Sequence, residues 1–338
     1  MASHLDRTLH LLEPRPYPRV LSLVIPLYNE EGVADLLRAE VTRFVDEVKC
    51  ETEVVLVNDG SSDGTLPKLV EWANADRRIK VIQLSRNFGH QRAATAGLDH
   101  ARGDAVVLMD ADLQDPLAVI HSMIARHSEG YDVVYGQRKR RRGESLLKRF
   151  TAWAFYRLMK ALVYERLPVD TGDFRLISRR CLAGLQSMHE THRFLRGMVA
   201  WVGFPQCAVE YERAPRAGGS TKYPMRKMLL FAWTAATSFS TLPLQVSLLL
   251  GIAVGIFGIE EAIRALLAFA LGWYVVPGWT SLTILTSVIG SALLISIGIL
   301  GQYVGRIYEQ AKSRPLYLVS RTFNIGCQDG SDAPEKRP

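Results

Sequence analysis

Two long stretches without a charged residue, 228–259 and 265–304, constrain the fold of this chain more than any other feature. Each exceeds the roughly 20 apolar residues that a helix needs to cross the ~30 Å hydrocarbon core of a bilayer. We therefore expect a transmembrane hairpin over 242–304, with spans near 242–268 and 279–304. Two buried core helices are the alternative, but the Gly, Ser and Ala content of the second stretch suits close helix packing in lipid.

The charges that flank these stretches predict the orientation of the hairpin. Basic residues precede the first span and follow the second: Arg226, Lys227, Arg306, Lys312, Arg314 and Arg321. The short connection between the spans carries no Lys or Arg. Because positive charge marks the cytoplasmic side, we expect a multi-pass protein of the cytoplasmic (inner) membrane with both termini inside. Residues 228–241 would form an interfacial helix, and 305–338 a cytoplasmic tail.

The part of the chain before the hairpin alternates apolar runs with helix-like segments. The expected strands are 20–26, 53–57, 80–84 and 105–109, and the expected helices are 30–48, 65–75 and 89–101. Apolar strands that alternate with helices indicate an α/β fold with a mostly parallel sheet and helices on both faces. We therefore predict a cytoplasmic catalytic domain over 20–227. A polar N-terminal tail precedes it over 1–19 and lacks the pattern of a signal peptide.

Charge and cysteine spacing argue against several classes of protein. A formal net charge of +7 suits nucleic acid, a membrane surface or an anionic substrate. The cations cluster beside the expected spans rather than along an aromatic-studded face, which disfavours nucleic acid. The four cysteines show neither CxxC pairs nor zinc-like spacing with His, so neither structural zinc nor a disulfide framework is expected.

The expected strand 105–109 is followed by a group of oxygen ligands. Asp110, Asp112 and Gln114 alternate along the chain, so in an extended segment their side chains can point the same way. Carboxylate and amide oxygens suit Mg²⁺ or Mn²⁺. Such an ion would bridge the two phosphates of a nucleoside diphosphate. Taken alone, the pattern is also compatible with an acidic turn before a helix.

Two other expected strands end in residues suited to a nucleoside. Tyr28 and Glu30 follow the first strand, where a Tyr ring can stack on a base; Asn29 as a helix cap is the alternative. Asp59 follows the second strand in the run NDGSSDGT (58–65), where it either binds the nucleoside or forms a turn. Ligands bind at the carboxyl ends of strands in such sheets, so the three groups should meet there.

Together these motifs resemble those of the family 2 glycosyltransferases, whose GT-A fold carries PxYNE, DGSSDGT and DxD in this order. The runs SRNFGHQ (85–91) and MDADLQDP (109–116) are similar to the polyprenyl-phosphate branch, which includes the dolichol-phosphate mannose synthases. DTGDFRL (170–176) and GSTKY (219–223) resemble the GtrB-like bacterial enzymes, which also carry two C-terminal spans. The resemblance covers nearly the whole chain.

This resemblance implies roles for the matching residues. Nucleotide contacts are implied for Pro26, Tyr28, Glu30, Asp59, Asp110 and Ala111. Metal ligands are implied for Asp112 and Gln114, with Asp110 beside them. Cations for an acceptor phosphate are implied for Arg138, Arg216 and Lys222, with Lys148, Arg149 and Arg175 as further candidates. Arg138 belongs to YGQR (135–138), which departs from the family's G-S-R by Gln for Ser.

The implied reaction transfers a sugar, with inversion, from a nucleotide-sugar to polyprenyl phosphate at the lipid bilayer. UDP-glucose is the first expectation for the donor; GDP-mannose, UDP-N-acetylhexosamines and aminoarabinose donors are alternatives. A phosphate oxygen needs little help from a base, so positioning and electrostatics should dominate. Asp173 is the candidate for a further catalytic role, as a base or by orienting Arg175. A structural ion pair with Arg175 is the alternative, and Asp170 is the second candidate.

Rival functions are disfavoured by missing or retained motifs. A processive polysaccharide synthase would need a QxxRW-type motif and more spans, and the sequence has neither. A noncatalytic scaffold would be expected to have lost Asp110, Asp112 and Gln114, which are present. His90 follows a strand, and a structural role for it is favoured over a place in the site. The resemblance also leaves room for a homo-oligomer.

Overall fold

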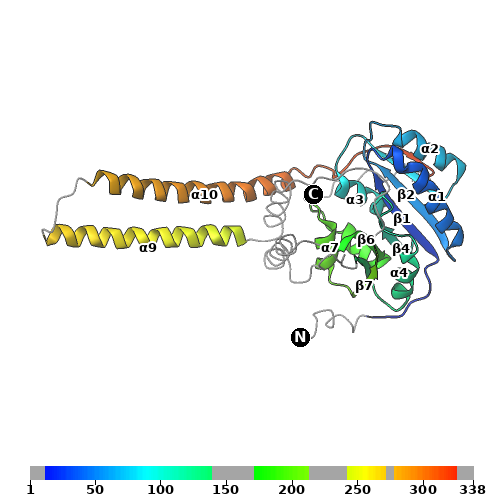
Figure 1. Ribbon diagram of the computed structural model, residues 1–338, viewed down its shortest axis with the longest axis horizontal. Helices are drawn as coiled ribbons and strands as arrows, with labels where there is room; N and C mark the ends of the chain where they lie inside the picture. Colours follow the sequence, from blue (N-terminus) through cyan, green and yellow to red (C-terminus); the bar gives the residue numbers. More distant parts are fainter. Residues whose placement is uncertain (1–11, 139–170, 213–241, 272–277, 326–338) are drawn as a thin grey trace, which may run out of the picture. The chain divides into compact units, whose positions relative to one another are not determined.

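The computed structural model describes residues 12–138, 171–212, 242–271 and 278–325 (Figure 1). The chain divides into two compact units. The first consists of Met1–Leu146, Arg166–Thr221 and Pro315–Pro338, and the second of Leu147–Glu165 and Lys222–Arg314. The first unit holds the strands, and the second holds two long helices.

The first unit is built on an eight-stranded sheet in the order β7-β5-β6-β4-β1-β2-β3-β8. Its strands are β1 (Val20–Leu27), β2 (Glu51–Asn58), β3 (Ile79–Leu84), β4 (Ala105–Leu108), β5 (Val133–Arg138), β6 (Thr171–Ser178), β7 (Gln206–Tyr211) and β8 (Val319–Phe323). β1 pairs in parallel with β2 and β4, β2 with β3, and β5 with β7. β6 is antiparallel to β4 and β5, and β8 is antiparallel to β3. The predicted mostly parallel α/β sheet is confirmed.

Helices cover both faces of this sheet, because successive side chains of a strand point to opposite faces. On one face, Leu23 and Ile25 share a core with α1 (Glu31–Glu47), α2 (Thr65–Ala75) and α4 (Val119–Ser128). On the other face, Val24 shares a core with α3 (His90–His100), α6 (Arg179–Gln186) and α7 (Leu195–Val202). Each strand between these layers therefore needs apolar residues on both sides, as the sequence pattern indicated.

The edge strand β8 lies in the segment 305–338, for which no strand was expected. It pairs with β3 so that Ile82 lies opposite Thr322. The side chain of Asn324, whose φ is 57°, donates to the carbonyl oxygens of Ala73, Asp76 and Ile79. The sheet is therefore completed by a strand from beyond the long helices.

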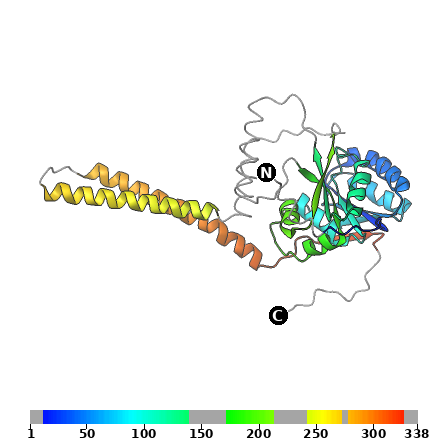
Figure 2. The same ribbon diagram turned by 90° about the horizontal axis from the view of Figure 1, so that it is seen from below.

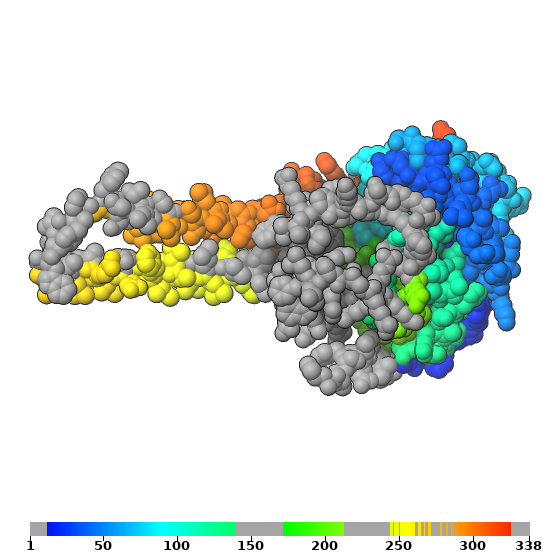
Figure 3. All heavy atoms as spheres, viewed as in Figure 1, coloured from blue at the N-terminus to red at the C-terminus, as the bar shows by residue number. Residues whose placement is uncertain are grey.

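The second unit contains α9 (Leu242–Ala270) and α10 (Trp279–Ala311), which lie side by side in two perpendicular views (Figures 1 and 2). Among the described residues, one segment, Val288–Ala311 of α10, is long and apolar enough to cross a membrane; α9 contributes a shorter apolar stretch, Ser247–Glu260. Figure 3 draws both helices with their side chains as spheres. Large apolar side chains are exposed along the pair, for example Leu294 at 71%. Both helices lie where the hairpin was expected, and one of them meets the length and composition of a span.

Candidate active site

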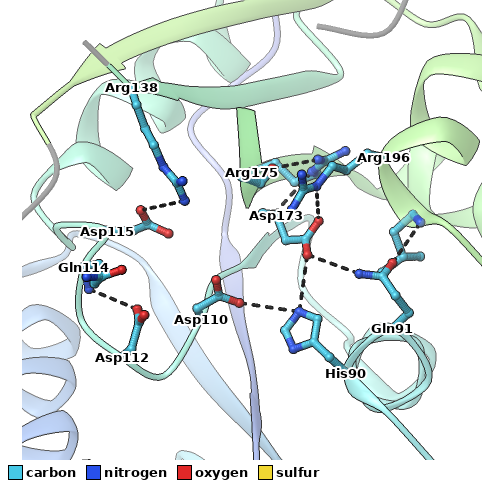
Figure 4. A network of polar contacts seen from close by, with 12 residues as sticks. His90, Gln91, Asp110, Asp112, Gln114, Asp115, Arg138, Asp173, Arg175 and Arg196 are labelled. Carbon is cyan, nitrogen blue, oxygen red and sulfur yellow. Dashed lines mark hydrogen bonds and ion pairs between the residues drawn. The ribbon is translucent and has the colours of Figure 1, made fainter. Parts of the chain in front are cut away.

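The carboxyl ends of β1, β2, β4 and β5 lie at one edge of the sheet, and the loops that follow them carry most of the predicted site residues. β6 runs antiparallel, so its first residues reach the same edge: Gln137 of β5 pairs with Thr171 of β6. This topology places Asp173 beside residues of α3 and α7 and beside Asp110 in the loop after β4 (Figure 4).

The loops after β1 and β2 hold each other in place. The Asn29 amide donates to Ser61 Oγ at 3.0 Å, and the Ser62 amide donates to Asn29 Oδ1 at 2.9 Å. The Glu30 amide donates to Thr65 Oγ1 at 2.9 Å. Asn29 therefore bridges the loops rather than capping α1, and its φ of 53° accompanies this turn.

The side chains around these loops differ in exposure. Tyr28 is 47% exposed at the end of β1, so its ring is open to a ligand. Pro26, in contrast, is buried within β1, where it pairs with Val57 of β2. Tyr28 is thus better placed than Pro26 for direct contact with a nucleoside.

Asp59 is 2% exposed and anchors the loop between β3 and α3. Its two carboxylate oxygens accept hydrogen bonds from the amides of Phe88 at 2.7 Å and Gly89 at 2.9 Å. Burial raises the pKa of this carboxyl, and the two amide bonds act against the rise. Gly60 beside it has a φ of 67°, and a Cβ there would lie 2.4 Å from the Arg86 carbonyl carbon. The NDG motif therefore shapes the loop that leads to His90.

His90 lies between two carboxylates. Its Nε2 is 3.3 Å from Asp173 Oδ2 and 3.5 Å from Asp110 Oδ1. Burial lowers the pKa of His90, but the hydrogen bond to Asp173 and the two negative charges outweigh this and raise it. Burial is also the main reason why the pKa of Asp110 is raised. The sequence favoured a structural role for His90, whereas the structure places it in the candidate site.

Asp173 has polar partners besides His90. Arg196 Nε donates to Oδ1 at 2.7 Å, and Gln91 Nε2 donates to Oδ2 at 3.2 Å. Gln91 Oε1 in turn accepts from the Leu195 amide at 3.0 Å, at the start of α7. Burial alone would raise the pKa of Asp173, but the bond from His90 and the charge of Arg196 hold it well below the usual carboxyl range.

Arg175, a candidate cation for the acceptor phosphate, lies against backbone carbonyl groups. It is 5% exposed, and its guanidinium donates to the carbonyl oxygens of Gly172 at 3.0 Å and Asp173 at 3.3 Å. Burial lowers its pKa to about 10. The ion-pair partner of the Asp173 carboxylate is therefore Arg196, which sequence reasoning missed, and Arg175 braces the backbone of β6.

Arg138, at the end of β5, faces a second acidic group. Its Nε donates to the Tyr211 hydroxyl oxygen at 3.4 Å, and one terminal nitrogen lies 4.0 Å from Asp115 Oδ1. The Tyr211 hydroxyl donates to the same Asp115 oxygen. Neither Tyr211 nor Asp115 was singled out from the sequence, although Asp115 lies within the MDADLQDP run.

The expected metal ligands lie on the turn after β4. The backbone N–H of Gln114 donates to Asp112 Oδ1 at 3.2 Å, and Leu113 between them has a φ of 54°. The third expected ligand, Asp110, has one carboxylate oxygen 3.5 Å from His90 Nε2 (Figure 4). Within 12–138, 171–212, 242–271 and 278–325, no three His, Cys, Asp or Glu side chains cluster to hold a metal. The donor set of Asp112 and Gln114 nevertheless fits Mg²⁺ or Mn²⁺, because Mg²⁺ typically takes one or two carboxylates plus substrate phosphates and water.

Several predicted residues lie outside the described parts of the chain. These are Lys148, Arg149, Asp170, Arg216 and Lys222, together with the interfacial helix expected over 228–241.

The comparisons with known proteins agree with the geometry. Residues 22–185 match the family model described as glycosyl transferase family 2. A Bacillus subtilis (strain 168) protein, the uncharacterized glycosyltransferase YkcC, is 42% identical over 90% of this chain and 94% of its own length. The chain belongs to glycosyltransferase family 2. This family 2 glycosyltransferase is also 37% identical to the bactoprenol glucosyl transferase of Shigella phage SfV, over 88% of its own length and 97% of the phage protein. The Escherichia coli (strain K12) prophage bactoprenol glucosyl transferase homolog is 36% identical, over 89% of this chain and 98% of its own length. The GT-A fold that the motifs implied is thus confirmed for the first unit.

Proposed function

We propose that this family 2 glycosyltransferase transfers a sugar from a nucleotide-sugar to a polyprenyl phosphate at a membrane, with UDP-glucose as the first candidate donor. The observation that carries the proposal is that Tyr28, Asp112 and Arg138 come from the ends of β1, β4 and β5, whose carboxyl ends lie at the same edge of the sheet. This places groups suited to a base, a diphosphate and an acceptor phosphate on one edge. The bactoprenol glucosyl transferases among its relatives support a lipid-phosphate acceptor.

On the donor side, we assign the base to the exposed ring of Tyr28 and the diphosphate to the turn that carries Asp112 and Gln114. Mg²⁺ or Mn²⁺ bound there would neutralise charge on the leaving diphosphate. Asp59 supports the donor site indirectly, because its carboxylate holds the amides of Phe88 and Gly89.

On the acceptor side, Arg138 is the described cation best placed to bind a phosphate. Among the described residues, its guanidinium makes one long hydrogen bond, to Tyr211, so its terminal nitrogens have capacity there for a phosphate oxygen. We also assign acceptor roles to Lys148, Arg149, Arg216 and Lys222, as the family resemblance implies. The apolar segment Val288–Ala311 would bring the enzyme to the lipid, with α9 as the second span of a cytoplasmically anchored hairpin.

The chemistry needs a nucleophile, a leaving group and little proton transfer. An oxygen of the acceptor phosphate forms a bond to the anomeric carbon, and the bond from that carbon to the β-phosphate oxygen breaks, so a nucleoside diphosphate leaves. The acceptor phosphate is largely ionised near neutral pH, by analogy with phosphorylated side chains. The depressed pKa of Asp173 makes this carboxylate a weak base. We therefore assign it the orientation of His90, Gln91 and Arg196 rather than a proton-transfer step.

Sugar transfer from a donor panel to a defined lipid tests this proposal. Purified full-length protein would be incubated with undecaprenyl phosphate and radiolabelled UDP-glucose, UDP-N-acetylglucosamine or GDP-mannose, with Mg²⁺, Mn²⁺ or a chelator. Asp112→Asn is the test variant. Asp35→Asn is the matched control, because the Asp35 side chain is 76% exposed on α1. We expect label to enter the lipid phase from one donor, and to be lost with chelator and in Asp112→Asn only. No transfer from any donor by folded protein would refute the proposal.

A further inference from the structure

A second polar cluster lies beside the site, and the proposed chemistry uses only one of its three members, Arg138. It consists of Asp115, Tyr211 and Arg138. The strand register brings it together, because Arg138 at the end of β5 pairs directly with Tyr211 at the end of β7. Two glycines make room for it. A Cβ on Gly136 would lie 2.8 Å from the Tyr211 ring, and one on Gly172 would lie 2.8 Å from a terminal nitrogen of Arg138. The side chains of this cluster are therefore confined by the backbone around them.

Asp115 is the least satisfied member of the cluster. It is 1% exposed, and its Oδ1 accepts from the Tyr211 hydroxyl, whereas its Oδ2 is buried without a hydrogen-bond partner among the described residues. A buried carboxylate is costly unless it faces a positive charge. Arg138, with a terminal nitrogen 4.0 Å from Oδ1, is the cation that the structure brings to it.

Tyr211 connects the carboxylate to the guanidinium. Its hydroxyl donates to Asp115 and accepts from Arg138 Nε at 3.4 Å. Its ring packs edge-on against Phe174, with centroids 5.8 Å apart, so the hydroxyl has a fixed direction. Burial, together with the bond to Asp115, raises the Tyr211 pKa to about 12, so the hydroxyl keeps its proton at neutral pH.

We propose that Tyr211 and Asp115 are positioning residues for Arg138, and that they fix its guanidinium so that its terminal nitrogens bind the acceptor phosphate. This inference rests on the proposed function, because it assumes that Arg138 receives that phosphate. Tyr211 occupies Nε, which leaves the terminal nitrogens for a bidentate contact. Asp115 holds the guanidinium by charge without neutralising it through a direct hydrogen bond. Without the pair, Arg138 remains charged but samples more rotamers, which weakens phosphate binding.

Tyr211→Phe is the test variant, because it keeps the ring against Phe174 and removes only the hydroxyl. We expect its KM for undecaprenyl phosphate to rise about 3- to 10-fold, as for the loss of one hydrogen bond, while its KM for the nucleotide-sugar changes less than about 2-fold. Tyr317→Phe is the matched control, since it removes a different Tyr–Asp hydrogen bond, to Asp99 at 3.0 Å. The control should leave the KM for the acceptor unchanged.

A double-mutant cycle separates positioning from general damage. In an Arg138→Ala background, Tyr211→Phe should have almost no further effect on the acceptor KM. Asp115→Asn is the second variant, for use even if Tyr211→Phe folds poorly. It keeps an acceptor for the Tyr211 hydroxyl but removes the charge that faces Arg138. Its acceptor KM should also rise, and Arg138→Ala should again erase the effect.

The possible outcomes have distinct meanings. An active wild type with an unchanged acceptor KM in both variants would overturn the inference. The inference would also be overturned if Tyr211→Phe or Asp115→Asn raised the acceptor KM further in the Arg138→Ala background. A rise in the KM for the nucleotide-sugar instead of the acceptor would overturn it as well. A wild-type protein that transfers no sugar to this lipid would overturn the proposed function, and with it this inference.

Discussion

The sharpest prediction concerns Asp173, which the sequence left open as a base or a structural partner. Asp173→Asn keeps the shape of the side chain but removes the charge that faces Arg196 and His90. Removing one partner of a buried ion pair costs about 3–5 kcal/mol. The Arg196 side chain is 35% exposed, so hydration of its guanidinium offsets part of this cost. We therefore expect a loss of about 2 kcal/mol, which lowers the melting temperature by about 4–8 °C for a domain of this size.

The catalytic effect of the same variant separates the two roles. Loss of a general base typically costs 10²–10⁴-fold in rate. If Asp173 only orients His90, Gln91 and Arg196, kcat should fall less than about 100-fold. The acid limb of the pH–rate profile should also be unchanged, because it follows ionisation of the acceptor phosphate, with a pKa near 6.

Melting curves and kcat between pH 5 and 9 provide the measurement. Asp132→Asn is a useful control, because Asp132 is also buried and paired with Arg15 and Arg180, but at the opposite edge of the sheet from the site. The control should lose stability and keep kcat. An Asp173→Asn variant with an unchanged melting temperature, a loss in kcat above 100-fold and no acid limb would refute our reasoning and restore the role of base.

Three further predictions concern stability. Gly97→Ala would place a Cβ 2.3 Å from Val24 Cγ1, and this overpacking should cost about 1–3 kcal/mol, seen as a lower melting temperature. Asn324→Ala removes the donor to three carbonyl groups and leaves a residue with positive φ, so it should cost about 1–3 kcal/mol in chemical unfolding. Burial alone would raise the folded-state pKa of Asp132 and Asp173. The hydrogen bond from Arg180 to Asp132, and the bond from His90 with the charge of Arg196 at Asp173, outweigh burial and lower both pKa values. The stability that these interactions provide at neutral pH should therefore be lost as the pH falls toward and below about 3.9, which unfolding measured from pH 7 to pH 3 will check.

Much of the sheet could be predicted from sequence, because its central strands are apolar on both faces. The bounds of the first four strands and of the three helices between them were predicted to within two residues. β8 could not be predicted, because its residues are mostly exposed and it joins the edge by backbone pairing with β3. The antiparallel insertion of β6 between β4 and β5 could not be predicted either, since strand order depends on long-range packing.

The site was predictable where residues sit next to a strand end. Tyr28, Asp110 and Asp112 were singled out as candidates because short motifs follow apolar runs. Arg196 and Tyr211 were missed because they come from α7 and β7, far along the chain, and reach the site only through the order of the strands. Their residue types carry no local signal of such a role.

The geometry also gives two predicted residues local partners that the sequence did not indicate. Asp59 was expected to touch the nucleoside, yet its oxygens hold the amides of Phe88 and Gly89. Arg175 was expected to bind phosphate, yet it is buried against backbone carbonyl groups. A sequence motif predicts which residue types are present, whereas burial and partners decide which of them face a ligand.

The measurement that tests the central claim most directly is the identity of the nucleotide released during transfer to undecaprenyl phosphate. Attack by the acceptor phosphate on the anomeric carbon releases a nucleoside diphosphate. Our account therefore predicts one UDP, with no UMP, for each sugar that enters the lipid from UDP-glucose, or GDP if GDP-mannose proves to be the donor. Release of a nucleoside monophosphate would mean transfer of a sugar phosphate, and it would contradict the mechanism that we derive from this site.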